Sequence, residues 1–142
     1  MQNFNFTDEL KKRNNGIFIK LSVYVFKEDN AYISYCPSLD LSGCGNDINE
    51  AKDSMEKTLM IYFDYALNKN TLLKDLRNHG WNVRGVKQKK IKAPKFDDLL
   101  HNEDFLDILE NKEYQKFDTP VEIRLSLVPI DLYKASRLTP SS

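Results

Sequence analysis

The residues that could perform acid–base or nucleophilic chemistry are few, because this chain of 142 residues has two histidines and two cysteines. His79 precedes Gly80 at the predicted end of a short helix, where the helix dipole favours a basic side chain, so we expect it to cap that helix. His101 lies in an acidic stretch and is expected to be exposed. We expect Cys36 and Cys44 to be small, reduced, buried side chains, although spacing alone leaves a Cys–His nucleophile pair open.

The loop motifs of common enzymes are absent from the sequence. It has no G-x-x-x-x-G-K-[ST], no G-x-G-x-x-G, no G-x-S-x-G and no C-x-x-C. The stretch Ser42-Gly43-Cys44-Gly45 is a pair of glycines, not a phosphate loop, and neither histidine has another metal-ligand residue at a recognisable spacing. We therefore predict that the protein is not an enzyme and holds no metal and no cofactor.

The charged residues are segregated, although 21 Lys and Arg balance 21 Asp and Glu over the whole chain. Residues 84–95 contain no acid, and their basic members are Arg84, Lys87, Lys89, Lys90, Lys92 and Lys95. Residues 97–113 contain one basic residue, Lys112, and the acids Asp97, Asp98, Glu103, Asp104, Asp107, Glu110 and Glu113. Zero net charge excludes a uniformly basic nucleic-acid coat, but the two segments could each form a charged patch.

Each charged segment has a functional interpretation and a structural one. The basic strip, residues 84–95, could bind phosphates or an acidic partner, with Trp81 available to stack on bases. The acidic segment, residues 97–113, could occupy the basic surface of a partner protein. The structural alternative is that the two segments neutralise each other and that Trp81 is a core aromatic next to a helix end.

The elements that must position these residues begin with strands. A period of two over residues 17–26, rich in β-branched and aromatic side chains, predicts a strand. A turn and residues 31–35 complete a hairpin, which Pro37 ends because it has no N–H for a ladder. Residues 39–44 are expected to form a third, short strand.

A long amphipathic helix follows the strands. Asp47 is its predicted N-cap, with Glu50 three residues on as in a capping box, and the helix is expected to end at 68–70. Its apolar stripe at steps of three and four residues consists of Ile48, Ala51, Met55, Leu59, Tyr62, Phe63 and Ala66.

The rest of the chain mixes helices and strands. Thr71 is expected to cap a short helix over 72–79, residues 81–91 to form an edge strand, and residues 96–111 to form one broken or two short helices. A half-buried strand is predicted at 121–128, before Pro129 and a frayed tail. The fold class is therefore α+β: a small antiparallel-rich sheet in the order β-β-β-α-α-β with helices on one face, plus a C-terminal helix and strand.

One segment, residues 32–59, resembles a known family. It combines a strand that ends in an aromatic residue, a Pro-x-Leu turn, a short strand, a glycine loop and a Glu-Ala pair that opens a helix. The residues that carry this pattern are Tyr35, Pro37, Leu39, Gly43, Gly45, Glu50 and Ala51. The combination resembles the signature of the HicB-like antitoxin family and covers about residues 17–85 when the flanking strands are counted.

The resemblance implies a truncated RNase H-like fold. It places a HicB-like domain at residues 1–95, with a polar lead at 1–15, and an extension at 96–142 that we expect to pack on the same domain. RNase H chemistry needs carboxylates that converge from strands onto two metals. Because residues 17–26 contain no Asp or Glu, we expect a non-catalytic relative.

The resemblance also implies a partner. HicB-like antitoxins bind a small ribonuclease toxin, HicA, and cover its catalytic surface. A toxin that grips RNA should be basic, which matches the acidic segment. The alternatives are a nucleic-acid-binding protein that uses the basic strip, and an oligomeric relative of the same fold without a toxin.

Assembly, DNA binding and location complete the expectations. Many family members carry a C-terminal helix-turn-helix or ribbon-helix-helix for operator DNA, but residues 96–142 show no such module, so DNA binding by this chain stays open. Exposed edge strands favour a homodimer or a higher oligomer. The first residues lack the apolar core of a secretory signal, and no apolar run approaches about 18 residues, so we expect a cytoplasmic protein without a transmembrane helix.

Overall fold

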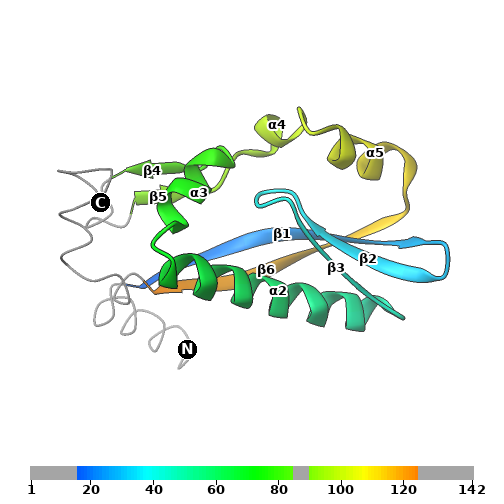
Figure 1. The fold of residues 1–142 in the computed structure, drawn as a ribbon. Helices are drawn as coiled ribbons and strands as arrows, with labels where there is room; N and C mark the ends of the chain where they lie inside the picture. The colour runs from blue at the N-terminus through cyan, green and yellow to red at the C-terminus, as the bar shows by residue number, and fades with distance from the viewer. Residues whose placement is uncertain (1–15, 85–89, 125–142) are drawn as a thin grey trace, which may run out of the picture.

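The computed structural model describes residues 16–84 and 90–124 of the chain (Figure 1). Four strands form an antiparallel sheet in the order β3-β2-β1-β6. These strands are β1 (Gly16–Glu28), β2 (Ala31–Cys36), β3 (Leu41–Gly45) and β6 (Tyr114–Arg124). A separate two-stranded sheet joins β4 (Asn82–Arg84) to β5 (Lys90–Lys92), and the helices are α2 (Ile48–Asn68), α3 (Leu72–Asn78), α4 (Phe96–Leu99) and α5 (Glu103–Asn111).

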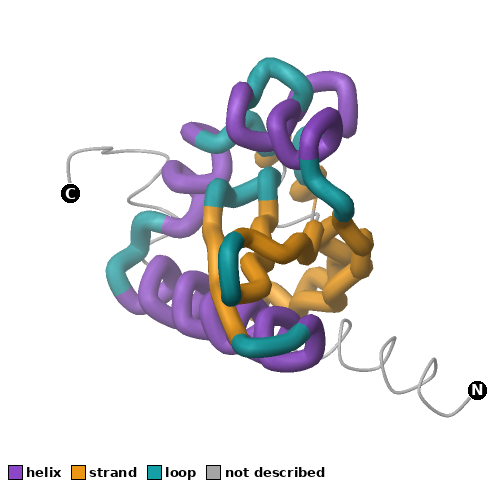
Figure 2. The backbone as a smooth tube through the Cα atoms, turned by 90° about the vertical axis from the view of Figure 1, so that its right-hand side faces the viewer, coloured by secondary structure: helices purple, strands orange, loops and turns teal. Residues whose placement is uncertain are grey.

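The four-stranded sheet is buried on two faces because the central strand β1 is apolar on both. Successive side chains of a strand point to opposite faces. Leu21, Val23 and Val25 pack in the cluster that contains the α2 residues, whereas Tyr24 and Phe26 pack in the cluster that contains α5 residues. Figure 1 shows α2 below the sheet and α4 and α5 above it, and Figure 2 shows helices on both sides of the strands after a quarter turn.

This architecture confirms the predicted α+β class. The first three strands, the long helix and the short helix that follows occur in the predicted order. Helices α2 and α3 contribute to one core, and the two short helices of residues 96–111 lie across the other face of the sheet. Among the described residues, no helix combines the length and hydropathy needed to cross a membrane.

Helix α2 begins as the sequence predicts. The Glu50 backbone N–H donates to Asp47 Oδ1 at 2.8 Å, which satisfies one orphan donor of the first turn. The Glu50 side chain turns back and accepts from the Asn46 N–H at 2.8 Å, one residue earlier than a standard capping box. The buried residues of the helix include most of the predicted stripe: Ala51, Met55, Leu59, Phe63 and Ala66.

The predicted start of α3 is wrong in one detail, whereas its predicted end is confirmed. Thr71 occupies the N-cap position but its side chain makes no capping hydrogen bond, so that part of the prediction is wrong. Gly80 adopts φ +86°, the left-handed conformation that favours glycine after a helix end. His79 lies at the C-cap and its Nδ1 is 2.8 Å from the Asp75 carbonyl oxygen, as its predicted capping role requires.

Two predicted strands need correction. Residues 81–91 do not form one edge strand, because β4 and β5 pair as a hairpin with Val83 opposite Ile91. The last strand begins at Tyr114, well before the predicted 121, and it pairs with β1 along its whole length. It contains Pro120, which is tolerated because β6 is at the edge of the sheet. The predicted strand end at Pro129 and the tail lie outside the described residues.

The division of the chain at residue 95 stays a prediction. The later segment is closely integrated with the earlier one, because β6 supplies a strand next to β1 and α5 covers β1 and β2. The packing of the whole extension, residues 96–142, on the same domain also stays a prediction, since residues 125–142 lie outside the described part.

Candidate functional site

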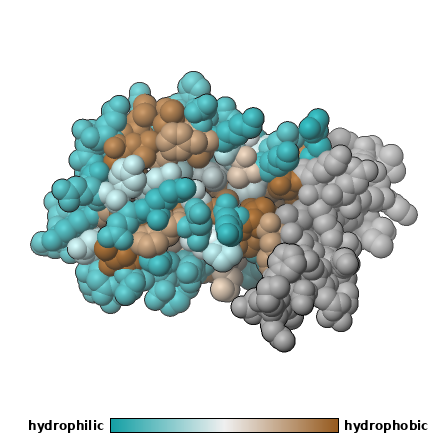
Figure 3. All heavy atoms as spheres, turned by 180° about the vertical axis from the view of Figure 1, so that it is seen from behind, coloured by the Kyte–Doolittle hydropathy of each residue, from teal (hydrophilic) through white to brown (hydrophobic). Residues whose placement is uncertain are grey.

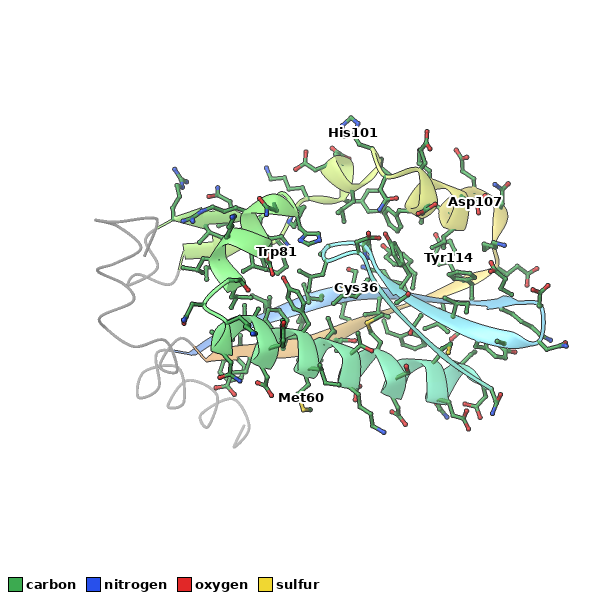
Figure 4. The ribbon with its side chains drawn as sticks, in the orientation of Figure 1. Cys36, Met60, Trp81, His101, Asp107 and Tyr114 are labelled. Carbon is green, nitrogen blue, oxygen red and sulfur yellow. The ribbon has the colours of Figure 1, made fainter. Side chains whose placement is uncertain are left out.

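The acidic residues of α4 and α5 are exposed on two helices that follow each other in the chain. All six predicted partner-binding acids are exposed. We call them the acidic surface, and they are Asp97, Asp98, Glu103, Asp104, Asp107 and Glu110. Figure 4 shows Asp107 on α5 at the top of the molecule, on the side of the sheet opposite Met60 of α2. A concentrated negative surface attracts a basic partner.

Helix α5 is anchored by aromatic packing. Phe105 is fully buried, and its ring lies 4.9 Å from the Tyr24 ring and 5.9 Å from the Phe96 ring, both in edge arrangements. Ile108 is buried one turn later. Because these two residues point inward, the acids between and around them must point outward.

Asn102 fixes the start of α5 and joins it to the sheet. Its Oδ1 accepts from the backbone N–H groups of Asp104 at 2.9 Å and Phe105 at 3.2 Å. Its Nδ2 donates to the Tyr35 hydroxyl at 2.8 Å. The side chain therefore acts as an N-cap and as a tether between α5 and β2.

The Tyr35 hydroxyl completes a short network. It donates to Asp40 Oδ1 at 2.6 Å, and Asp40 sits in the left-handed region at φ +53°. Burial, the hydrogen bond to Asp40 and the charge of that carboxylate raise the pKa of Tyr35 well above its ordinary value. The phenol therefore stays protonated at neutral pH and acts as a hydrogen-bond donor, not as a base.

A polar groove of about 450 Å³ runs between this network and α5. Its carboxylates come from three places in the chain: Glu28, Asp40, Asp104 and Asp107. Lys112 at its border pairs with Glu28 at 3.2 Å. A groove with several carboxylates and a single ammonium offers acceptors for a lysine or arginine side chain.

The seven residues that carry the family resemblance have mainly structural roles. Pro37, Leu39 and Ala51 are buried. A Cβ on Gly45 would lie 2.6 Å from the Ala51 backbone N, and a Cβ on Gly43 would lie 2.6 Å from Ser54 Oγ. These glycines let β3 approach α2 closely. Tyr35 alone among the seven also borders the polar groove.

The basic strip is only partly described. Arg84 and Lys92 are exposed on the β4–β5 hairpin, while Lys87 and Lys89, and the side chain of Lys90, lie outside the described part. Between described residues, the ion pairs join Lys112 to Glu28 and Lys116 to Asp118, so neither links the strip to the acidic surface.

Trp81 is a core residue and not a stacking platform. Its side chain is 3 % exposed, and its Nε1 donates to the Ser38 carbonyl oxygen at 2.8 Å. The alternative in which its ring stacks on bases is therefore wrong, because the ring is already packed in the core beside α2 and α3.

The remaining nucleophiles and bases are not gathered into a catalytic group. Cys36 is buried, which raises its pKa to about 11, so its thiol is inert at neutral pH. Cys44 is exposed, which corrects the expectation of burial. His101 is exposed as predicted. In the part of the chain that the structure describes, no three His, Cys, Asp or Glu side chains are placed to hold a metal ion.

Two members of the site were missed from the sequence. Neither Asp40 nor Asn102 was singled out as a site residue. The signal for Asn102 was available, because an asparagine directly before Glu103-Asp104-Phe105 is a typical N-cap. The sequence held no signal for the hydrogen bond between Asn102 and Tyr35, since the two residues are 67 positions apart.

Comparison with known proteins identified no relative of this chain. No protein-family model matches the chain, and neither a curated protein nor a solved structure matches it. The resemblance to the HicB-like family therefore depends on its seven motif residues, and membership of that family stays a prediction.

Proposed function

We propose that this protein is a non-catalytic, antitoxin-like inhibitor that binds a small basic ribonuclease of the HicA type and masks its RNA-binding surface. The observation that carries the proposal is the acidic surface, whose six carboxylates are exposed on α4 and α5, two helices that Phe105 and Ile108 of α5 anchor on the sheet. A basic surface that binds RNA phosphates is complementary to it. The inhibitor acts in the cytoplasm, where such a toxin meets its RNA.

Apolar area beside the acids supports a protein partner over a small ion. Phe96 is 52 % exposed, and Leu99, Leu100 and Leu109 are half-buried. Figure 3 shows, from behind, an apolar patch at the top of the molecule, the height of α4 and α5, with hydrophilic atoms around it. An apolar centre with a charged rim is the usual composition of a protein interface.

The polar groove supports recognition of individual basic side chains. Its carboxylates lie beside the Tyr35–Asn102 network, which holds α5 against β2. A lysine or arginine of the partner that enters the groove would form charge-assisted hydrogen bonds there. The proposed interface therefore combines a general attraction with at least one fixed anchoring point.

The test is capture of a partner and the effect of charge reversal on the complex. The chain is co-expressed with the short basic reading frame beside its gene, and the affinity of the purified pair is measured at increasing salt. The double variant Asp104→Lys/Asp107→Lys should weaken binding by about 100-fold or more, because close charge pairs at interfaces couple strongly. Affinity of the unmodified pair should fall as salt rises.

The matched control reverses an equally spaced pair of exposed acids on α2. Asp53→Lys/Glu56→Lys changes the net charge by the same amount but on the other side of the sheet, so it should change affinity less than about threefold. Because Glu56 borders the groove between α2 and β6, the oligomeric state of this variant is measured alongside. Equal losses in both variants, or no binding of a basic ribonuclease by the unmodified protein, would contradict the proposal.

A second candidate is binding of nucleic acid through the β4–β5 hairpin. Arg84 and Lys92 are exposed there, which favours contact with phosphates. Reversal of Lys87, Lys89 and Lys90 to Glu should then abolish a salt-sensitive affinity for RNA or DNA. Unchanged nucleic-acid affinity in that variant rejects this candidate. That result would leave the proposal of a protein partner at the acidic surface unaffected.

A further inference from the structure

The outer face of α2 carries an exposed apolar patch far from the acidic surface. Met60, Ile61 and Tyr65 are 64 %, 67 % and 62 % exposed. Figure 4 shows Met60 below α2, pointing away from the sheet. The inward face of the helix is already filled by Leu59 and Phe63, so the fold does not need the outward residues. Large apolar side chains grouped on a surface mark a binding site.

One pair of opposite charges is spaced equally on either side of the patch. Lys57 and Asp64 are exposed and lie on the same side of the helix as Met60 and Ile61, at spacings of three and four residues. Lys57 precedes Met60 by as many residues as Asp64 follows Ile61. The face therefore has a lysine before the apolar centre and an aspartate after it, and the exposed Asp53 lies beyond Lys57, four residues earlier.

We propose that this face binds a second copy of the chain, with the two α2 helices antiparallel about a two-fold axis between Met60 and Ile61. The symmetry places Lys57 of each copy opposite Asp64 of the other. Met60 packs against Met60 of the second copy on one side of the axis, and Ile61 against Ile61 on the other. A two-fold interface must be complementary to itself, and this pattern of charge and apolar side chains meets that requirement.

The groove beside α2 extends the same interface. It has a volume of about 550 Å³ and lies between α2 and β6, with Leu59, Met60 and Phe63 on one wall and Pro120 and Val121 on the other. Side chains of the second copy that enter it add apolar area to the helix contact, towards the roughly 1,200 Å² that a specific interface buries. Pro120 lacks an N–H, which disfavours extension of the sheet by strand addition at β6.

This inference is independent of the partner proposed for the acidic surface. Helices α2 and α5 lie on opposite sides of the sheet, so a dimer through α2 leaves α5 accessible in both copies. Dimerisation is measured on the purified chain alone, and its failure would not affect the test of toxin binding.

The test is sedimentation equilibrium of the full chain over a dilution series, with circular dichroism to check folding. Ile61→Glu should raise the dimer Kd by about 100-fold, because it places two like charges at the centre of the interface. Lys57→Glu and Asp64→Lys should each raise the Kd by about tenfold, since each creates like-charge pairs. The double variant Lys57→Glu/Asp64→Lys restores opposite charges and should recover most of the affinity.

The matched control is Lys74→Glu on α3, an exposed charge reversal outside the proposed face, which should leave the Kd unchanged. A chain that is monomeric up to about 1 mM overturns the proposal, since such weak association is not specific. A dimer that survives Ile61→Glu, or a double variant no tighter than the single ones, also overturns it.

Discussion

The two faces of the sheet are built by different means. The α2 face is a long aliphatic core in which a 21-residue helix packs on Leu21, Val23 and Val25. The α5 face is a small aromatic cluster around Phe105, bordered by the Tyr35–Asp40–Asn102 network. One face therefore depends mainly on burial, whereas the other depends on a few specific contacts.

The residues that stabilise the fold and the residues that are free to bind a partner lie mainly on different faces of the sheet. The motif residues Gly43, Gly45 and Ala51 serve the α2 face, where they bring β3 and the helix together. The exposed carboxylates belong to the α5 face. We infer that α5 is the less stable element, because few buried residues hold it.

The largest expected difference between the faces comes from truncating one buried phenylalanine on each. Phe63→Ala in α2 should lower the free energy of unfolding of the whole chain by about 3–5 kcal/mol, because it leaves a cavity in the main core. Phe105→Ala should instead release α5 while the sheet and α2 stay folded. Urea unfolding and hydrogen exchange of the α5 amides measure the two effects.

If Phe63→Ala and Phe105→Ala lower the free energy of unfolding equally, and hydrogen exchange is not selectively faster in α5, the two faces unfold as one unit. The conservative variant Phe105→Leu provides the control for Phe105→Ala. It keeps most of the buried volume, so it should retain α5 on the sheet.

Alkaline pH should weaken the α2 face through Cys36. Burial raises the pKa of Cys36 from 9.0 to about 11 in the folded chain. Because the folded pKa is higher, the stabilisation is complete below pH 9 and is lost as the pH rises towards 11, by at most about 3 kcal/mol. Urea midpoints across this window should fall less steeply for Cys36→Ala than for the unmodified chain.

Cys44→Ala is the matched control for the pH series, because Cys44 is exposed. Its midpoints should follow those of the unmodified chain. If the urea midpoint of Cys36→Ala falls with pH as steeply as that of the unmodified chain, other groups cause the loss of stability at alkaline pH. The phenols of Tyr35 and Tyr62 are candidates, since burial raises the pKa of both.

The glycine contact of the α2 face should tolerate no side chain. Gly45→Ala places a Cβ 2.6 Å from the Ala51 backbone N, which cannot rotate away, so we expect a loss of about 1–3 kcal/mol in unfolding free energy. Gly80→Ala, whose Cβ would meet Pro94 Cγ at an ordinary 3.7 Å but at φ +86°, should cost about 1 kcal/mol and serves as the comparison. Thermal unfolding that ranks Gly80→Ala as the worse variant would contradict this account of the motif.

The smallest effects should come from the helix caps. Asn102→Ala removes the cap of α5 and the bond to Tyr35, and should cost about 1–2 kcal/mol, mostly as faster exchange in α5. Asp47→Ala should cost about 1 kcal/mol at α2. Thr71→Ala should cost close to nothing, because its side chain makes no capping bond. A loss at Thr71 as large as that at Asn102 would contradict the assignment.

The sequence was informative where a pattern is local. The alternation in β1, the stripe of α2 and the Asp47 cap were all predicted, because each depends on neighbours within one or two turns. Tyr24 and Phe26 also carried an unused signal, since aromatic residues on the second face of β1 indicate that this face is covered too.

The sequence was not informative where distant segments meet. The pairing of β6 with β1 joins residues about a hundred positions apart, and local alternation in residues 114–120 is weak and ends in a proline. The charges of the acidic surface were visible in the sequence. The polar groove beside these charges could not be predicted from the sequence, because Glu28, Asp40 and α5, which line it, are far apart in the chain.

Hydrogen exchange of the chain with and without its captured partner tests the central claim most directly. If the acidic surface binds the partner, the amides of Glu103–Asn111 should exchange more slowly in the complex, while those of Ile48–Asn68 should not change at a fixed chain concentration. Slower exchange in α2 or in the β4–β5 hairpin, with none in α5, would contradict the account.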